Sequence, residues 1–411
     1  MSRVGLVVVG AGPHALTVTA ELIVDGLVDP GELVVLDPTG CWLDQWQRAF
    51  DRLGITHLRS PVVHHPHPEV DAILRRRDLR DGDVTAGEVP VPSQRVFLAL
   101  ARELVEALDL DGCVQPARAR SLHVGEDGTV HVECDDATSI RADRVVVATN
   151  TAVPVTLQGL VPCAVPEPPE VTAGDHVVVI GGGLTAAQLV RRVLVDGAGV
   201  TLVTRRPIVE RAFDVDPGWM GPKYLADYTR LADPVERLAA VREARDGGSM
   251  PAGDAEWIRG LAASGQIELC EGAAATAVER NGDTTIVRLA GGHEVRCDHV
   301  VAALGSRFAV ENDPLLAPFV ASGRVGAIGG YPLLDPALRV PGTSVHVCGR
   351  AAMLELGPAA GNLSGARRAA RRISAHVAGV DPVAADPGVS NQPIVPSRCG
   401  SGVAAGRSWA G

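Results

Sequence analysis

Residues 4–20 read VGLVVVGAGPHALTVTA, and this stretch decides the fold of the chain. An unbroken apolar run at residues 6–9 predicts a buried strand that leads directly into a glycine turn and a helix. Each small residue has a role in such a unit. Gly10 permits the sharp turn, Gly12 lets the backbone approach a pyrophosphate, and Ala15 lets helix and strand pack closely. The stretch therefore predicts a dinucleotide-binding site.

The residues that follow supply the rest of this signature. Pro13 and His14 open the helix, whose N-terminus presents unpaired N–H groups and a partial positive charge to phosphate. A second apolar run at residues 32–36 ends in Asp37, about 20 residues beyond the turn. A carboxylate at this position binds ribose hydroxyls, so it favours an adenine dinucleotide without a 2′-phosphate.

Composition excludes several classes of protein. The chain has 411 residues with 38 basic and 49 acidic side chains, a net charge of −11 and no basic block. Nucleic acid and anionic membrane are therefore not expected partners. The apolar segments are too short or too interrupted by charge to span a bilayer, and no cleavable signal precedes the first strand. Eight scattered cysteines lack a C-x-x-C pair, which argues against a redox disulfide, a zinc site and a secreted disulfide framework. We expect a soluble, cytoplasmic protein.

The rest of the first unit carries recognisable helix, strand and turn patterns. Apolar residues recur at helical spacing over residues 93–108. Residues 122–132 and 139–148 read as strands, with a hairpin turn at residues 125–128. Residues 154–169 are rich in proline, which is the composition of a linker between domains.

A second glycine signature follows this linker. Residues 176–180 predict a strand that enters a turn with Gly181 and Gly183, and Thr185 and Ala186 lie in the first turn of the next helix. The order of parts repeats that of the first unit. It predicts a second dinucleotide site.

The strand after this helix ends in two arginines rather than in an acid. Residues 200–203 read as a strand and run through Thr204 into Arg205 and Arg206. Paired guanidinium groups bind a 2′-phosphate through charge and bidentate hydrogen bonds, so this site is expected to prefer NADPH over NADH. The alternative is a solvated basic strand end, because arginine is common on protein surfaces.

Later segments complete a plan of two similar units. Residues 207–262 form a polar, helix-rich insertion, and residues 297–305 repeat the valine-rich pattern and small-residue turn of residues 144–150. Residues 345–366 again read as strand, loop and helix. The Pro-, Gly- and Ser-rich tail beyond about residue 381 is predicted to be disordered.

This plan resembles the two-dinucleotide-binding-domain flavoproteins over nearly all of residues 4–375. The resemblance implies an α/β fold with two Rossmann-like domains, in which the NADPH domain is inserted in the FAD domain. The expected boundaries are 1–160 for the first part of the FAD-binding domain, 165–305 for the inserted NADPH-binding domain, 306–380 for the closing part of the FAD-binding domain and 381–411 for the tail.

A looser resemblance is to the lysine/ornithine N-monooxygenase group of flavin monooxygenases and its relatives, which include oxidative-stress growth-inhibitor proteins. Residues 40–46 are similar to the G-x-W…W segment of flavin monooxygenases. Residues 181–187 are similar to the G-G-G-x-[ST]-A-A turn of the group, and residues 350–362 are similar to its G-P-x-x-x-N ending.

Two positions depart from the family pattern. Flavin monooxygenases usually carry an F-x-G-x-x-x-H or H-S-x-x-Y element before the second glycine turn, whereas residues 159–172 hold neither His nor Tyr. This departure favours a flavoprotein that does not insert oxygen. Asn150 stands where the family has glycine, and we expect it to adopt the left-handed backbone conformation that asparagine tolerates.

The resemblance also implies which residues meet the flavin. A closing helix that begins near Gly357 and Pro358, after Gly349, would point its positive end at the pyrimidine ring and stabilise negative charge on reduced flavin. Thr149 would lie beside the cofactor. Asn362 would hydrogen-bond there, or else it is a polar residue that faces a turn.

Other candidates would shape the substrate pocket. Trp42 and Trp46 lie four positions apart and would wall the isoalloxazine, unless they only fill the core as tryptophan usually does. Arg59 and Lys223 are candidate anchors for an anionic group, or else surface cations. The histidine-rich residues 57–67 do not predict a metal site, because prolines interrupt them and they bring no helical i, i+4 pair and no partnering cysteine or acid.

These residues leave three functions open. The leading hypothesis is an FAD-dependent, NADPH-consuming monooxygenase similar to the N-hydroxylases. In it dioxygen adds to reduced flavin, and the C4a-(hydro)peroxyflavin oxidises a small polar metabolite. The alternative is an NAD(P)H-dependent flavoprotein reductase, dehydrogenase or oxidase without oxygen insertion. The third is a flavin-binding regulatory protein. A small-molecule substrate and dioxygen are the partners implied, and nothing in the sequence argues for an oligomer.

Overall fold

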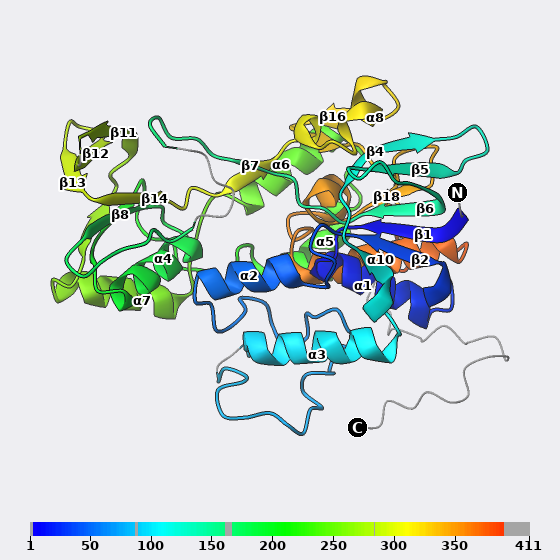
Figure 1. The fold of residues 1–411 in the computed structure, drawn as a ribbon, viewed down its shortest axis with the longest axis horizontal. Coiled ribbons are helices and arrows are strands. Elements are labelled where there is room, and N and C mark those ends of the chain that lie inside the picture. The colour runs from blue at the N-terminus through cyan, green and yellow to red at the C-terminus, as the bar shows by residue number, and fades with distance from the viewer. Residues whose placement is uncertain (1–2, 87–88, 161–166, 283, 390–411) are drawn as a thin grey trace.

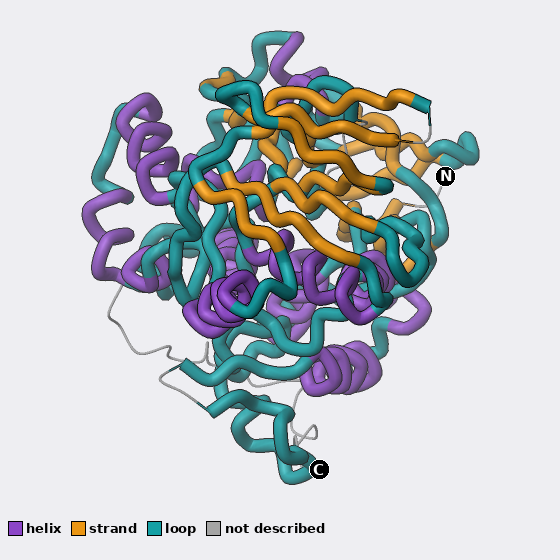
Figure 2. Tube along the Cα trace, turned by 90° about the vertical axis from the view of Figure 1, so that its left-hand side faces the viewer, coloured by secondary structure: helices purple, strands orange, loops and turns teal. Residues whose placement is uncertain are grey.

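The computed structural model describes residues 3–86, 89–160, 167–282 and 284–389 of the chain (Figure 1). Two lobes lie along the long axis of the molecule, one built on a mixed sheet and the other on a parallel sheet, with helices against each. The middle of the chain forms one lobe, and the beginning and end form the other. Seen along the long axis, the strands form a layer with helices below it (Figure 2). The predicted α/β fold with two Rossmann-like units is confirmed.

The first lobe is organised around β1 (Arg3–Val9), which lies between two parallel neighbours. β1 pairs with β2 (Leu33–Leu36) on one side and with β6 (Ser139–Val147) on the other, as expected for a strand whose apolar run is buried on both faces. The other strands of this seven-stranded sheet are β3 (Val114–Gln115), β4 (Ala119–Val124), β5 (Val130–Cys134) and β18 (Val345–Val347).

One edge of β6 serves two partners because the strand is long. Its first half pairs antiparallel with β5, and its second half pairs parallel with β18, with Val145 opposite Val345 and Val147 opposite Val347. The chain therefore returns to the first sheet after it has built the second lobe. All four of these valines are buried, so β18 completes the core of the first lobe.

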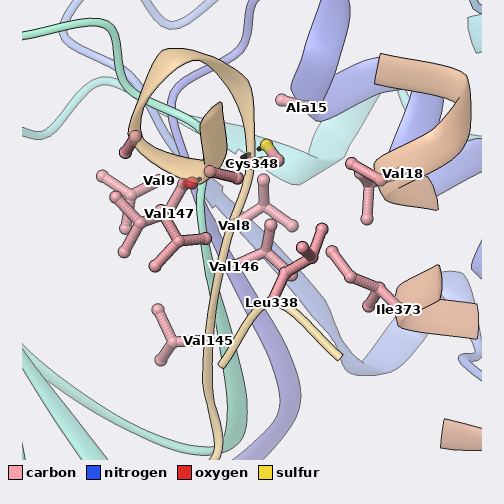
Figure 3. Packing of buried hydrophobic residues seen from close by; sticks show 14 of the residues in the cluster. Val8, Val9, Ala15, Val18, Val145, Val146, Val147, Leu338, Cys348 and Ile373 are labelled. Carbon is pink, nitrogen blue, oxygen red and sulfur yellow. Dashed lines mark hydrogen bonds between the residues drawn. The ribbon is translucent and has the colours of Figure 1, made fainter. Parts of the chain in front are cut away.

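Two helices from opposite ends of the chain cover one face of this sheet. α1 (Pro13–Val24) follows β1, α10 (Leu363–Val377) follows β18, and the two helices pack against each other. Figure 3 shows Ala15 of α1 and Ile373 of α10 in one apolar cluster with Val146 of β6. Ala15 is fully buried, so the predicted close approach of helix and strand is confirmed.

The second lobe has a four-stranded parallel sheet in the order β10-β9-β8-β14. Its strands are β8 (His176–Ile180), β9 (Gly199–Thr204), β10 (Glu268–Glu271) and β14 (His299–Ala302). A separate antiparallel sheet contains β11 (Ala275–Asn281), β12 (Thr284–Leu289) and β13 (Glu294–Cys297). Helix α4 (Leu184–Val195) follows β8, and α7 (Ala252–Ala263) packs against α4. The strand–turn–helix order predicted from residue 176 onward is confirmed.

Two crossing strands and the insertion join the lobes. β7 (Ala152–Pro154) pairs with β15 (Ser306–Phe308) where the chain passes between the sheets. The insertion contributes α5 (Pro222–Tyr228) and α6 (Pro234–Ala244) to the first lobe, where the hydroxyl of Tyr228 donates to the carbonyl of Leu354 at 3.0 Å. The remaining elements are α2 (Asp44–Arg52), α3 (Gln94–Ala107), α8 (Ala317–Ala321), α9 (Met353–Leu356), β16 (Ala327–Ile328) and β17 (Tyr331–Pro332). No helix in the described ranges combines the length and apolar character that a membrane crossing needs.

Two expectations about local backbone are wrong. The closing helix does not begin near Gly357 and Pro358, because α9 ends at Leu356 and α10 begins only at Leu363. Gly357 has a φ of +80°, which interrupts the helical path between them. Asn150 does not have the positive φ expected of it, so the chain leaves β6 without a left-handed turn at that residue.

The disordered tail was predicted to begin too early. Asp386 is fully buried and accepts hydrogen bonds from Arg368 at 2.8 Å and from Arg372 at 2.7 Å, both on α10. This charged cluster holds residues 381–389 against the first lobe, because a buried carboxylate needs such partners. Residues 390–411 lie outside the described residues.

Candidate functional site

A cleft of about 1600 Å³ reaches from the turn after β1 to the turn after β8 and passes the N-terminus of α10. Sites for one small molecule typically measure roughly 300–1,000 Å³. The two glycine turns therefore face one shared space that is large for a single ligand.

The first glycine turn has the geometry that its sequence predicts. Gly10 has a φ of +99°, and a Cβ there would lie 3.0 Å from the carbonyl oxygen of Ala148. A Cβ on Gly12 would meet no atom of the described residues within 4 Å, so open cleft lies directly in front of the N-terminus of α1. The turn leaves room for a phosphate beside the first N–H groups of this helix.

Asp37 and Thr149 lie at the same end of the cleft. Asp37 accepts hydrogen bonds from the N–H of Ala11 at 3.0 Å and from the hydroxyl of Thr39 at 2.7 Å, which fix its carboxylate just after β2. Thr149 has a buried hydroxyl oxygen with no hydrogen-bond partner among the described residues. Buried polar atoms normally have partners, so Thr149 fits a polar ligand in the cleft.

Pro13 and His14 line the cleft where α1 begins. His14 Nε2 lies 3.1 Å from the carbonyl oxygen of Ala360, and Gly349 packs beside the ring. Burial lowers the pKa of His14, which makes the neutral imidazole the stable form. With the proton on Nε2, His14 donates to Ala360 and ties α1 to the loop before α10. His14 therefore supports the loop before α10 and does not supply a positive charge to a phosphate.

Asn362 is the N-cap residue of α10 and lines the cleft. Its Nδ2 donates to Asp214 at 2.9 Å, and Arg245 donates to the other oxygen of the same carboxylate at 2.9 Å. Asp214 and Arg245 come from the insertion and also line the cleft, yet neither was predicted, because no motif surrounds them. Gly357 and Pro358 do not line the cleft. The helix N-terminus that faces the cleft here is that of α10, at Asn362.

Arg350 is a second cationic side chain of the cleft that the sequence did not single out. It follows β18 and Gly349, and its guanidinium donates to the hydroxyl of Ser306 at 2.9 Å and to the carbonyl of Ser306 at 2.6 Å. Its Nε is buried and has no partner among the described residues. Burial lowers the pKa of Arg350 from its usual value. The signal for Arg350 in the sequence was its position shortly after β18, the strand that completes the first sheet.

The second glycine turn repeats the backbone of the first. Gly181 has a φ of +147°, and a Cβ there would lie 2.5 Å from the carbonyl oxygen of Ala303. Thr185 lines the cleft, and Ala186 is fully buried between α4 and the sheet. These residues lie in the strand, turn and helix as the sequence predicts, and their contact with a dinucleotide stays a prediction.

The space in front of the second turn is partly filled by the protein itself, although the turn still lines the cleft. The backbone of Gly183 packs against Gly248, so that a Cβ on Gly183 would lie 3.4 Å from the Cα of Gly248. The N–H of Leu184, the first residue of α4, donates to the carbonyl of Ser249 at 3.0 Å. The sequence carried no sign of this cover, because the two segments are far apart in the chain.

The two arginines after β9 differ in the contacts that they already make. Arg206 donates to the carbonyl of Gly248 at 3.1 Å and lies 3.7 Å from the carboxylate of Asp246. Arg205 is exposed on the rim of the cleft and has no hydrogen bond or ion pair with any described residue. Arg205 is therefore the one of the pair that is free to bind an anion.

The two tryptophans have different surroundings. Trp46 lines the cleft and stacks on Phe50 with ring centroids 3.9 Å apart, while Phe97 lies behind it at 4.8 Å. Trp42 donates its indole N–H to the carbonyl of Leu110 at 3.1 Å and does not line the cleft. Trp46 therefore lies where it could contact a ligand in the cleft, and its role beside a flavin stays a prediction, whereas Trp42 packs against the core.

Neither predicted anion anchor is placed for that role. Arg59 lines the cleft, but its guanidinium donates to the carbonyls of Arg211, Ala212 and Ser249 and to the hydroxyl of Ser249, at 2.8 to 3.1 Å. It therefore fastens the loop after α2 to the second lobe. Lys223 is exposed on α5, lies 4.9 Å from the ring centroid of Tyr224 and is not part of the cleft.

The histidine-rich loop lies beside the cleft without forming a metal site. His64 lines the cleft, and burial, followed by the charge of Arg367, lowers its pKa to about 4. Arg367 donates to the carbonyls of His67 at 2.7 Å and Pro68 at 2.9 Å and so supports the loop from α10. Among the described residues, no three His, Cys, Asp or Glu side chains gather closely enough to hold a metal ion.

No protein-family model matches the chain, and a search of curated proteins found no match. Solved structures do share its fold. An ornithine N-hydroxylase from Kutzneria sp. 744, in complex with reduced FAD, NADP+ and L-ornithine, has a TM-score of 0.70 at 15% identity, covering 92% of this chain and 99% of that one. The FAD-bound cadaverine monooxygenase of the desferrioxamine pathway from Erwinia amylovora has a TM-score of 0.69 at 14% identity, covering 95% and 98%.

A flavoprotein of another kind also has this fold. The bacillithiol disulfide reductase from Bacillus cereus has a TM-score of 0.57 at 17% identity, covering 92% of this chain and 99% of that one. The predicted resemblance to two-dinucleotide-binding-domain proteins, and more loosely to the N-monooxygenase group, is thus confirmed for the fold.

Proposed function

We propose that this protein is an FAD- and NADPH-dependent oxidoreductase, and within that class a monooxygenase that hydroxylates a small polar metabolite. The observation that carries the proposal is the shared cleft, in which both glycine turns face one space. A nicotinamide and a flavin need such a common space, because hydride transfer requires the two rings to be in contact. The N-hydroxylating enzymes among the structural neighbours support the monooxygenase branch.

The residues at the first turn fit an FAD. The open space at Gly12 and the free start of α1 suit its pyrophosphate, and Asp37 suits its ribose. Thr149 offers an unpartnered hydroxyl, and Arg350 offers positive charge toward the flavin end. Once bound, the flavin would supply the electron transfer and the reaction with oxygen.

NADPH would bind at the second turn, with its 2′-phosphate at Arg205. This guanidinium is exposed on the rim of the cleft and makes no bond to a described residue, so binding there breaks no existing contact. Arg206 is the weaker candidate because it already donates to Gly248.

The protein's own contribution would be to orient the ligands and exclude water. Arg59 joins the loop after α2 to the second lobe, and the bond from Asn362 to Asp214 joins α10 to the insertion. These links close the cleft around its contents, which protects reactive species from solvent. We expect the substrate to carry an amine, as ornithine and cadaverine do, with Asp214 as its acidic partner.

A second candidate is a flavoprotein reductase that does not insert oxygen. Residues 159–172 lack the expected His or Tyr, and a disulfide reductase is among the structural neighbours. Residues 161–166 of this stretch lie outside the described residues. The lower TM-score of that neighbour makes this the second choice.

Rapid-mixing absorbance on the FAD-loaded protein tests both candidates. NADPH and NADH are each mixed with the oxidised protein without oxygen, and the loss of flavin absorbance is followed. The reduced protein is then mixed with ¹⁸O₂ and a panel of small amines, and products are analysed by mass spectrometry. Faster reduction by NADPH together with one ¹⁸O atom in a product is the expected result.

Other outcomes assign the protein differently. Rapid reduction with no labelled product from any amine, but with turnover of a disulfide, would establish the reductase. Failure of both nicotinamides to reduce the flavin would contradict the proposal and leave the regulatory role.

A further inference from the structure

Residues 245–249, Arg-Asp-Gly-Gly-Ser, form a segment that we call the strap. The strap follows α6 and crosses the N-terminus of α4, where the carbonyl of Ser249 accepts the N–H of Leu184 at 3.0 Å. Gly248 touches Gly183 so closely that a Cβ on Gly248 would lie 3.1 Å from the Cα of Gly183. The strap therefore covers the glycine whose counterpart in the first unit faces open cleft.

Side chains from both lobes hold the strap in this place. Arg206 donates to the carbonyl of Gly248 at 3.1 Å, and Arg59 donates to the carbonyl of Ser249 at 3.1 Å. Asp246 accepts two hydrogen bonds from Arg211, at 2.7 and 3.1 Å. Residues 245–248 are half-buried or exposed, whereas Ser249 is buried and Met250, which follows it, lies in the core of the second lobe. A segment that is fixed at one end and otherwise held by polar contacts opens at lower cost than one packed in a core along its whole length.

The covered position is the one that a dinucleotide needs. In a strand–turn–helix unit the pyrophosphate lies against the second glycine and accepts hydrogen bonds from the first N–H groups of the helix. At α4 the strap already packs on Gly183 and already accepts the N–H of Leu184. The strap therefore occupies part of the space that a pyrophosphate would need, although the second turn still lines the cleft.

We infer that the strap is a competing internal occupant of the nicotinamide dinucleotide site and leaves it when the pyrophosphate binds. This inference rests on the proposed function, because it takes NADPH as the ligand of the second turn. Two states are involved, strap closed and strap open. The dinucleotide binds only the open state, so its apparent Kd is the intrinsic Kd divided by the open fraction.

The strap also connects the second site to the first lobe. Arg245, its first residue, donates to the carbonyl of Pro358 at 2.7 Å and to Asp214, which in turn accepts from Asn362 at the start of α10. Displacing the strap strains or breaks these bonds. Nicotinamide binding is thereby coupled to the edge of the cleft where the flavin is expected, and the coupling is reciprocal.

Titration calorimetry on the FAD-loaded protein tests the strap with two ligands. NADP+ carries a pyrophosphate, whereas adenosine 2′-monophosphate carries the 2′-phosphate without one. Asp246→Ala removes the bonds to Arg211 and the ion pair with Arg206, and Gly247→Ala strains the closed strap because Gly247 has a φ of +127°. We expect each variant to bind NADP+ about five-fold more tightly and adenosine 2′-monophosphate unchanged.

A matched control separates this effect from simple loss of negative charge. Asp227→Ala removes an exposed carboxylate on α5 whose partner is Arg230, outside the strap, and it should leave both affinities unchanged. Hydrogen exchange gives a second readout. NADP+ should speed exchange in a peptide covering residues 245–250, and adenosine 2′-monophosphate should not.

The outcomes distinguish the strap from the proposed function. If NADP+ binds and neither strap variant changes its affinity, or if both ligands gain equally, the strap does not compete and the inference is overturned. If neither ligand binds wild type or any variant, the second turn is not an NADPH site and both proposals fall. Binding of NADP+ to the variants alone would support a strap that is closed in nearly all wild-type molecules.

Discussion

The two glycine turns of this protein have the same local construction and different access. Gly10 and Gly181 both have positive φ. Each lies against the backbone carbonyl of the residue just after a neighbouring parallel strand, Ala148 after β6 and Ala303 after β14. In front of Gly12 the cleft is open, whereas the strap packs against Gly183 and partly covers it. A dinucleotide motif therefore specifies the shape of the turn and does not specify how easily a ligand can enter it.

The first glycine of each turn should tolerate a side chain least. Gly181→Ala places a Cβ 2.5 Å from the oxygen of Ala303, and Gly10→Ala places one 3.0 Å from the oxygen of Ala148, both at positive φ. We expect losses in the free energy of unfolding of about 3 kcal/mol for Gly181→Ala and about 2 kcal/mol for Gly10→Ala. Urea unfolding of each variant measures the difference.

Gly182→Ala is the control for this pair, because its Cβ would meet Thr204 only at 3.6 Å. It should cost less than about 1 kcal/mol. Equal losses for all three variants would show that the close approach to the carbonyl is not what requires glycine.

The second glycine of the first turn should matter for binding and not for folding. A Cβ on Gly12 meets nothing within 4 Å, so Gly12→Val should change the free energy of unfolding by less than about 1 kcal/mol. The same side chain fills the space expected for the FAD pyrophosphate and should weaken FAD binding about 30-fold, or about 2 kcal/mol. Fluorescence titration of the apoprotein with FAD checks this, and unchanged affinity would contradict the assignment of the first turn.

Acid should loosen the first lobe through its closing strand. Burial lowers the pKa of His346 on β18 to about 4, and its Nδ1 lies 3.1 Å from the carbonyl oxygen of Ala337. Because the folded pKa is below the unfolded value of about 6.5, the unfolded chain takes up the proton first. Stability present above pH 6.5 is therefore lost as the pH falls toward 4, by about 2 kcal/mol.

Urea unfolding at pH 7 and pH 4.5 measures this loss, and hydrogen exchange locates it. His346→Gln keeps a donor for Ala337 but has no titrating group, so its stability should depend less on pH than that of the wild type. Peptides of β1 and β18 should exchange faster at pH 4.5 after correction for intrinsic rates. An unchanged pH dependence in His346→Gln would assign the effect to other groups.

The smallest effect concerns the two arginines beside the covered turn. Arg205→Ser removes the free guanidinium and should raise the apparent Kd for NADPH about 10-fold, or about 1.4 kcal/mol, with little change for NADH. Arg206→Ser also releases the carbonyl of Gly248, so it should change NADPH binding less. Loss of NADH and NADPH binding to the same extent in Arg205→Ser would refute a 2′-phosphate contact.

The parts of the site that lie within one strand–turn–helix unit were predictable from the sequence. The places of Gly10, Gly12 and Ala15 follow from local backbone requirements, and those of Asp37 and Thr149 follow from their positions at strand ends in a parallel sheet. The start of the closing helix was predicted too early, and the reason is also local. Gly357 has a positive φ that interrupts the helical path, and α10 begins only after its N-cap residue Asn362.

The parts built from distant segments were not predictable in the same way. Asp214 and Arg245 meet Asn362 only because α5 and α6 pack on the first lobe, and no periodicity marks that contact. Arg59 was a candidate anchor for an anionic group in the sequence, yet its guanidinium already donates hydrogen bonds to carbonyls of the second lobe. A side chain's partners across a cleft depend on where whole elements dock.

The two turns, the strands that lead into them and the helices that follow could all be read from the sequence, because hydrophobic periodicity and glycine conformation act over a few residues. Tertiary structure alone decided which turn is open and which is covered. The strap reaches Gly183 from about 65 positions away, through hydrogen bonds to backbone atoms that every sequence possesses. Such contacts leave no residue-type signature, so only the packed chain reveals them.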